Sequence, residues 1–432
     1  MTLSSIWTYS LESTAWLCAH EAQGCAVSAY FMIQKLFFQL IRVAIGTQDT
    51  LTRAPSAEEW KLLYDMAKKQ SLVGICFAGV QRLNSLYPSL LSQLPEVLYL
   101  QWMGMAAKIQ QKNEGVTKDV ASVREHFQQQ GMDMVLLKGQ GNLCNYPENL
   151  RGLRTPGDID AWVMPKGFGD MPLKERMKND EWFLRWLWKK DKSIRHCYIH
   201  VVYPQIVQSE VEVHFRPSYL NSPIRNRWFQ KWMMEEAPKQ VANKVKLPTN
   251  SDEKVEVAVP TAEFNVVYQL SHLYRHIFDD GLGLRQILDY YFVLRAADKE
   301  CFKVSSFDSA QEPSSKLQEV SDLIESFGMK KFARALMYVL QSHLGLDEKY
   351  LLCEPDEEAG KFLLDEIMTA GNFGQYDERE RVAKHENGVQ RLLRRQKRNM
   401  RFFGQYAEEV MCVPVYRVYQ EWWRLKMNWK CK

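Results

Sequence analysis

The sequence predicts an α+β fold in which a small mixed sheet lies between two helical regions. Helical periodicity dominates residues 32–130, short apolar runs bounded by turn residues occupy 131–259, and helical periodicity returns over 260–432. The chain has 432 residues, of which 46% are hydrophobic and 25% are charged, as expected for a globular protein with an ample core. We therefore expect about two or three domains, with the sheet in the central one.

The N-terminal segment 1–31 differs from the rest of the chain. It lacks helical periodicity, and it has no basic start followed by an apolar block, so a secretory signal is not predicted. The first clear helical pattern begins at Met32 and continues to Ile41. We interpret 1–31 as a poorly ordered extension or a mis-called start. The alternative is an additional helix that packs on the domain.

Further helices are predicted in the N-terminal region after the one that begins at Met32. Ser56 and Glu59 have the spacing of a capping box, which predicts a helix that begins after Ser56. A second helix follows over Ser71–Leu83, and Val97–Gln130 has the pattern of one or two long helices. Gly131 is placed to cap the end of the last of them.

Two strands are predicted on either side of a glycine turn. Met134–Leu137 is a short apolar run, Lys138-Gly139-Gln140-Gly141 interrupts it, and Asp158–Val163 forms the second strand. Because side chains alternate along a strand, Asp158 and Asp160 lie on one face. Two neighbouring carboxylates repel each other unless a cation lies between them. Hard cations such as Mg²⁺ prefer these oxygen ligands, so the pattern indicates a metal site.

A further strand pair is predicted over Ile194–Val202 and Val207–Phe215. Polar and apolar residues alternate in the second of these strands, so Glu210, Glu212 and His214 share one face. If this strand lies beside the one that carries the two aspartates, a third carboxylate joins the metal site. Glu212 is the first candidate and Glu210 its competitor. His214 either faces the metal or forms a structural hydrogen bond.

These elements occur in a fixed order: the sequence LLKG, then Arg154-x-x-x-Asp158-Ile159-Asp160, then Glu212-Val213-His214-Phe215. The ordered set resembles the group-five bacterial family of uncharacterised nucleotidyltransferases, which belongs to the superfamily of DNA polymerase beta. The resemblance extends from about residue 35 to the C-terminus. One departure is the phosphate-binding turn, which is Lys138-Gly139 here and Gly-Gly or Gly-Ser in most of the superfamily.

The resemblance implies Mg²⁺-dependent transfer of a nucleoside monophosphate from a nucleoside triphosphate to an acceptor hydroxyl, with release of pyrophosphate. Two Mg²⁺ ions are expected, and Mn²⁺ is a possible substitute. Asp158 and Asp160 would bind both ions, and Glu212 would bind the ion on the acceptor side. Three further residues of this region are expected to hold the nucleotide: Lys138, Gly139 and Arg154. The alternative for Lys138 and Arg154 is that they are surface charges.

The acceptor stays open at this stage, because a protein hydroxyl, an RNA end and a small molecule all fit the same chemistry. A different class of function is also compatible with these residues. The chain could be a non-catalytic nucleotide-binding or regulatory protein that retains the nucleotidyltransferase fold.

Histidine pairs raise the question of zinc. His196 and His200 fall in a predicted strand, where a spacing of four residues separates them by about 13 Å, too far for one metal ion. His272 and His276 fall in a predicted helix over Phe264–Phe278, where the spacing suits a metal but no third ligand is evident. Two residues that follow, Arg285 and Asp289, either close over the nucleotide or tie helices together.

The C-terminal region is predicted to be helical over Val320–Leu344 and Glu357–Thr369, after a loop at Phe302–Leu317. Basic residues of Arg391–Arg401 recur at helical spacing, which indicates either contact with nucleic acid or a solvated face with acidic partners in the chain. Val413–Trp429 mixes tryptophan with Arg and Lys. This stretch either lies on a membrane surface or packs on the core.

Net charge and cysteine usage limit the remaining possibilities. The formal net charge of +4 is too close to balance to indicate nucleic acid by itself. The nine cysteines are scattered, with no CxxC pair, which favours reduced thiols and a cytoplasmic location over disulfides or a zinc site.

Overall fold

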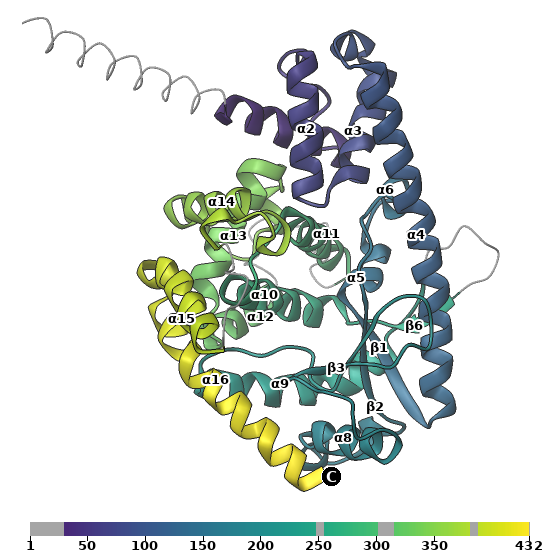
Figure 1. Ribbon diagram of the computed structural model, residues 1–432, viewed down its shortest axis with the longest axis vertical. Coiled ribbons are helices and arrows are strands. Elements are labelled where there is room, and N and C mark those ends of the chain that lie inside the picture. Colours follow the sequence, from purple (N-terminus) through teal and green to yellow (C-terminus); the bar gives the residue numbers. More distant parts are fainter. Residues whose placement is uncertain (1–29, 248–254, 301–314, 381–387, 432) are drawn as a thin grey trace, which may run out of the picture.

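The computed structural model describes residues 30–247, 255–300, 315–380 and 388–431. The α+β prediction is confirmed: one mixed sheet is surrounded by helices from both ends of the chain (Figure 1). The segment 1–29 and residues 302–314 of the loop predicted over Phe302–Leu317 lie outside the described residues. The last three residues of that predicted loop are instead helical, because a helix begins at Ser315. None of the helices in the described ranges is both long and apolar enough to span a membrane.

The N-terminal region is helical, as predicted. The capping box is present, because the Ser56 side chain accepts from the Glu59 backbone while the Glu59 carboxylate accepts from the Ser56 backbone. The long helical pattern forms one helix, and Gly131 follows it with a positive φ of 75°. The helices of this region are 30–45, α2 (Ala57–Lys69), α3 (Val73–Leu86) and α4 (Glu96–Gln129).

The sheet has six strands in the order β3-β4-β2-β1-β6-β5. β2 runs antiparallel to β1 and parallel to β4, and β1 runs parallel to β6, so the sheet is mixed. The two outer pairs, β3 with β4 and β5 with β6, are antiparallel. The strands are β1 (Met132–Leu137), β2 (Ile159–Pro165), β3 (His200–Val202), β4 (Val211–His214), β5 (Lys244–Leu247) and β6 (Val255–Ala258).

Several central elements differ in extent from their predictions. The strands predicted over Ile194–Val202 and Val207–Phe215 shorten to β3 and β4, because 194–199 and 203–210 are mostly turns, bends and irregular backbone. The hairpin β5–β6 was not predicted, since its four-residue strands KVKL and VEVA are too short to show a pattern. Helices complete this region: α5 (Lys138–Gly141), α6 (Glu148–Arg151), α7 (Leu173–Arg176), α8 (Asn179–Lys190) and α9 (Pro223–Ala242).

Both faces of the sheet are covered. Ile159, Ala161 and Val163 of β2 lie in one hydrophobic core, as their alternation predicts. Trp162 and Met164 point to the opposite face and lie in a second, larger core. β2 is therefore buried on both sides, which holds the carboxylates at its start on a rigid support.

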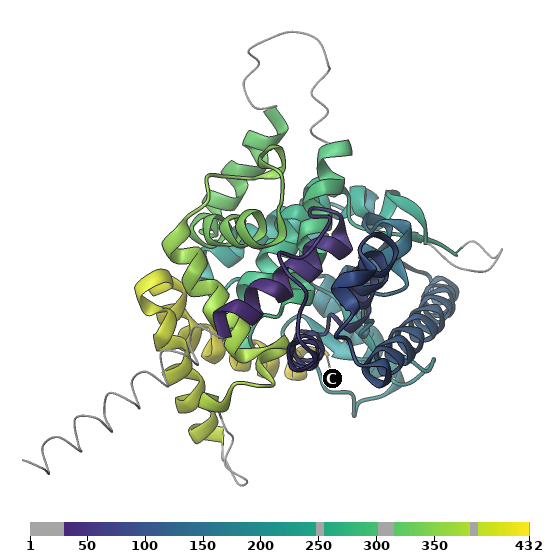
Figure 2. The same cartoon turned by 90° about the horizontal axis from the view of Figure 1, so that it is seen from above.

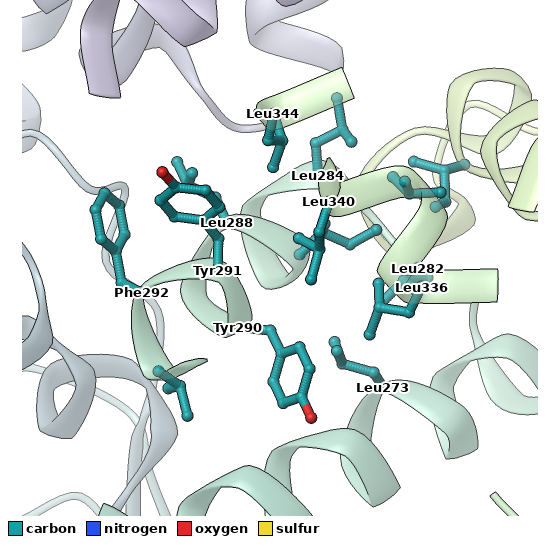
Figure 3. Close-up of a cluster of buried hydrophobic side chains, with 14 of the residues drawn as sticks. Leu273, Leu282, Leu284, Leu288, Tyr290, Tyr291, Phe292, Leu336, Leu340 and Leu344 are labelled. Carbon is teal, nitrogen blue, oxygen red and sulfur yellow. The ribbon is translucent and has the colours of Figure 1, made fainter. Parts of the chain in front are cut away.

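The C-terminal helices close the larger core. Leucines and tyrosines of α10, α11 and α13 interlock in the cluster drawn in Figure 3. The helix at 30–45 lies between the other N-terminal helices and the C-terminal ones (Figure 2), so one core spans both helical regions. These helices are α10 (Ala262–Asp279), α11 (Leu284–Glu300), α12 (Ser315–Ser326), α13 (Lys330–Leu344), α14 (Glu357–Ala370), α15 (Gly388–Asn399) and α16 (Phe403–Cys431).

Burial of a carboxyl group in α16 makes stability depend on pH. The Glu409 side chain is 4% exposed and accepts from the Asn221 backbone N–H at 3.1 Å, and burial raises its pKa to about 7. In the unfolded chain this group ionises near pH 4.5, so its contribution to stability is lost as pH rises from about 4.5 to 7. We expect Glu409→Gln to stabilise the fold by roughly 1 to 3 kcal/mol at pH 8, with little effect at pH 4.5.

Urea unfolding of the wild type and of Glu409→Gln at the two pH values measures this effect. Glu408→Gln is the matched control, because Glu408 is an exposed neighbour on the same helix. Equal effects of the two substitutions at pH 8 would contradict the assignment.

Candidate active site

Three carboxylates meet where β2 and β4 begin. The parallel register places Asp160 directly opposite Glu212, and Asp158 lies one residue before β2. One carboxylate oxygen from each residue lies within 4.8 Å of the other two. The Asp160 side chain is 3% exposed and that of Glu212 is 18% exposed, so the cluster is partly shielded from solvent. A donor set of oxygens this close together fits a divalent cation.

The structure brings Glu212, not Glu210, to the two aspartates. Glu210 lies just before β4, where its carbonyl accepts from the Ile159 N–H at 2.9 Å while its side chain is exposed. Glu212 is inside β4 and faces Asp160 across the parallel pair. β4 begins one residue after Glu210, so the alternation of side chains in the strand does not extend to Glu210. The predicted strand contained both glutamates and therefore could not distinguish them.

Lys138 extends into the carboxylate cluster from the turn after β1. Its Nζ lies 2.8 Å from Asp160 Oδ1. Burial disfavours the charged amine, but the carboxylates of Asp160, Asp158 and Glu212 outweigh burial and raise the pKa of Lys138. Both residues of the turn have positive φ, 28° at Lys138 and 45° at Gly139. Such backbone is strained for lysine and unstrained for glycine, so the turn is held in a demanding conformation.

Two histidines complete the cluster. His214 Nε2 lies 3.0 Å from Asp160 Oδ1 and 3.5 Å from Glu212 Oε2, and its Nδ1 lies 3.3 Å from the Arg216 carbonyl. Burial opposes the charged imidazole, but the hydrogen bonds to the two carboxylates raise the pKa of His214. His200 Nδ1 lies 3.2 Å from Glu212 Oε2, yet forms no hydrogen bond. His214 therefore orients two of the three carboxylates.

The position of His200 was missed at the sequence level. Its spacing from His196 along the sequence gives no sign of the site, whereas β3 pairs it with His214 of β4. The predicted pairing of these two strands could have indicated the position of His200, because pairing places a residue of one strand opposite a residue of the other. His196 lies outside β3 and packs against Trp188 and Trp423.

Arg154 forms a buried ion pair. Its Nε and Nη2 each donate to Asp289 at 2.7 Å, and the Tyr146 hydroxyl donates to the same carboxylate at 2.7 Å. The side chains of Arg154 and Asp289 are each 5% exposed. Since these bonds join the segment before β2 to α11, the observed contacts give Asp289 the structural role. Contact of Arg154 with nucleotide stays a prediction.

Arg285 is a second cation close to the carboxylate cluster, and its guanidinium has fewer hydrogen bonds than that of Arg154. It lines a small cavity of about 40 Å³ together with Lys138, Asp158 and Asp160. Its Nη1 donates to the Thr155 carbonyl at 3.3 Å, but its buried Nε forms no hydrogen bond. Burial and the neighbouring Arg154 lower the pKa of Arg285. An anion in this cavity would accept a hydrogen bond from the unbonded Nε and would offset the cost of burying the charged guanidinium.

A larger cleft of about 1080 Å³ also reaches Asp158. One wall is α4, which contributes Lys108, Lys112 and Lys118, and the opposite wall includes Glu210. A groove of similar volume between α4 and α6 touches none of the three carboxylates. The cleft that reaches Asp158 is therefore the better candidate for the entry of a substrate.

The second histidine pair does not form a metal site in the described residues. His272 Nε2 and His276 Nε2 lie 3.2 Å apart on α10, and no third ligating side chain joins them among the residues the structure describes. Burial lowers the pKa of both imidazoles, so they form a neutral, hydrogen-bonded pair.

The basic residues of α15 and of the short turn after it have partners within the chain. Arg395 lies 3.8 Å from Asp280, Arg398 donates to the Asp279 carbonyl at 3.1 Å, and Arg401 lies 3.3 Å from Asp377. These contacts support the interpretation of a face with acidic partners. Contact with nucleic acid through Arg391–Arg401 stays a prediction.

Cysteines contribute no disulfide within the described ranges. The six that the structure describes are free thiols, at Cys76, Cys144, Cys197, Cys353, Cys412 and Cys431. The other three lie outside the described residues.

Carboxylates on two neighbouring strands, beside a lysine–glycine turn on a third, define a site suited to metal-assisted transfer of a phosphorus-containing group. The chain belongs to a family of uncharacterised nucleotidyltransferases, whose family model matches residues 56–320. This confirms the predicted family, although the match is shorter at both ends than the resemblance indicated. Neither the curated proteins nor the solved structures contain a match to the chain.

Proposed function

We propose that the protein transfers a nucleoside monophosphate from a nucleoside triphosphate to an acceptor hydroxyl, in a reaction that depends on Mg²⁺. The observation that carries the proposal is the cluster of Asp158, Asp160 and Glu212, whose oxygens lie within 4.8 Å of one another, with Asp158 also lining a large cleft. These residues would hold two Mg²⁺ ions, or Mn²⁺. Bound there, the ions would supply neutralisation of phosphate charge and orientation of the hydroxyl.

The reaction exchanges a phosphoanhydride bond of the nucleotide for a phosphoester bond to the acceptor. The acceptor oxygen forms a bond to the α-phosphorus, the bond from that phosphorus to the bridging oxygen of pyrophosphate breaks, and the hydroxyl proton leaves the acceptor. Glu212 has a more exposed side chain than Asp160, 18% against 3%, and we assign it the role of favouring loss of this proton. The acceptor is a protein, an RNA or a small molecule.

Two cations of the chain are placed to contact phosphate. Lys138 Nζ already faces the carboxylate cluster, and Gly139 lets the backbone approach closely because it has no side chain. Arg285 faces the same cavity with an unbonded Nε. We assign the phosphate-binding fork to Arg285 because the Nε and Nη2 of Arg154 are already bonded to Asp289.

The matched pair Glu212→Gln and Glu210→Gln tests the third ligand. We expect Glu212→Gln to lower turnover by about a hundredfold or more, because one anionic ligand at the reacting centre is lost. Glu210→Gln, two residues away and exposed, should change turnover by less than about threefold. Pyrophosphate release with saturating nucleotide measures both. The reverse order of effects would assign the site to Glu210.

A non-catalytic nucleotide-binding protein is the second candidate, and the contact between Lys138 and Asp160 favours it. An ammonium group 2.8 Å from Asp160 Oδ1 supplies one positive charge where a metal would supply two. Calorimetry with ATP, GTP, CTP and UTP in Mg²⁺ separates the candidates when it is combined with pyrophosphate release. Binding with turnover supports the enzyme, and binding without turnover in the presence of cell extract supports the second candidate.

A further inference from the structure

The outer face of α16 carries an apolar stripe. Six large side chains are each more than half exposed, although they belong to one helix that packs firmly on the core. A contiguous apolar strip on the order of several hundred Å² marks an interaction surface more often than a bare surface. The members of the stripe and their exposed fractions are Met411 60%, Val415 57%, Val418 72%, Trp422 53%, Leu425 64% and Trp429 86%.

The stripe is separate from the face that attaches α16 to the protein. Tyr416, Trp423 and Met427 of α16 are buried in the core beside the sheet. At about 100° per residue, these three side chains point roughly opposite to the stripe. In Figure 1, α16 runs along the edge of the molecule, and no other element covers its outer side along the C-terminal half. α16 therefore has two apolar faces, of which the fold uses one.

The spacing of the stripe is that of a coiled-coil seam. Successive members lie four, three, four, three and four residues apart, from Met411 to Trp429. This is the a/d repeat of a heptad, with Val415, Trp422 and Trp429 at position a.

The charges that border the stripe indicate which partner fits it. Glu421 is at position g and Lys426 at position e of this repeat. In a parallel two-stranded coil, a residue at g faces the residue five positions later on the other helix. A second copy of α16 therefore meets Glu421 with Lys426 twice, once on each side of the seam. An antiparallel pair brings g to g and e to e, and does not form these contacts.

We propose that two copies of this protein associate through α16 as a parallel two-stranded coiled coil. The seam joins the stripes of the two copies, and the pairs between Glu421 and Lys426 fix the direction. We expect a seam of six side chains to bury less than the roughly 800 Å² per partner of a standard interface, and we expect the dimer to dissociate at micromolar concentrations. This inference is independent of the nucleotidyl transfer proposed above.

Light scattering of the full chain from 1 to 100 micromolar tests the proposal. The wild type should approach twice its monomer mass as concentration rises. Val418→Glu should raise the dissociation constant by about a hundredfold, because a carboxylate is buried in the seam. Gln420→Glu is the matched control, since it introduces the same carboxylate on the same helix but off the stripe. A wild type that is monomeric at 100 micromolar, or a Val418→Glu dimer of unchanged strength, overturns the proposal.

Direction is tested by charge exchange and by cross-linking. Glu421→Lys and Lys426→Glu should each weaken the dimer, and the double variant should restore it. Leu425→Cys should form a disulfide between copies under oxidation. In an antiparallel pair centred on the stripe the two thiols would be about 15 Å apart along the axis and would not join. Cys431→Ser serves as the background for this experiment.

A lipid surface is the competing occupant. Sedimentation with phosphatidylcholine–phosphatidylserine vesicles checks it with the same variants. The dimer is overturned if the wild type stays monomeric and sediments with the vesicles while Val418→Glu does not sediment with them. Dimerisation without vesicle binding supports it.

Discussion

Replacing Asp158 and Asp160 together by alanine should abolish pyrophosphate release. Both carboxylates belong to the cluster that would hold the metal ions, and Asp160 also contacts Lys138 and His214. Loss of metal-assisted charge stabilisation of several kcal/mol corresponds to a rate decrease of roughly a thousandfold or more. Release of pyrophosphate from labelled nucleotide, with Mg²⁺ and the acceptor supplied by extract, measures the effect.

The double variant also removes the charged partners of a buried lysine, so its fold must be checked by circular dichroism and urea unfolding. Asp158→Asn is the gentler variant, because Asp158 is only partly buried and precedes the strand. It should retain the fold and lose most of the turnover. Undiminished turnover in the folded double variant would refute the assignment of the metal ligands.

Replacing Arg154 by alanine should destabilise the protein by about 3 to 5 kcal/mol. The substitution leaves the Asp289 carboxylate buried without its bidentate partner, which is among the most costly single changes in a protein interior. The Tyr146 hydroxyl remains as a neutral donor and offsets only part of this cost. Equilibrium unfolding in urea at pH 7 measures the change in free energy.

Arg285→Ala is the matched control for Arg154. Arg285 lies in the same cavity, but its Nε has no hydrogen bond and its pKa is lowered, so its removal should cost little stability. It should instead weaken binding of the nucleotide by about tenfold or more. If Arg285→Ala unfolds the protein while Arg154→Ala selectively weakens nucleotide binding, the two roles are reversed.

The sequence predicted the parts of the site that local patterns determine. Alternation along β2 placed Ile159 and Ala161 in the core, and the capping box at Ser56 marked the start of α2. Asp158, Asp160 and Glu212 were brought together by one assumption, that their strands are neighbours, and the parallel register of β2 and β4 supports it.

Contacts between distant segments were not predictable in the same way. Asp289 lies 135 positions from Arg154, and nothing in the local pattern indicates that the two form a pair. His200 reaches Glu212 only because β3 is the edge strand beside β4. β5 and β6 are stabilised by neighbours in the sheet more than by their own short sequences, so no period was visible.

Transfer of label from nucleotide to acceptor tests the central claim most directly. The protein is incubated with Mg²⁺, cell extract and each nucleoside triphosphate, labelled in parallel at the α- or the γ-phosphate. Nucleotidyl transfer predicts that α-label becomes attached to an acceptor, that γ-label is released as pyrophosphate, and that Asp158→Asn loses both. Attachment of γ-label, or α-label transfer that is undiminished in Asp158→Asn, would contradict the account.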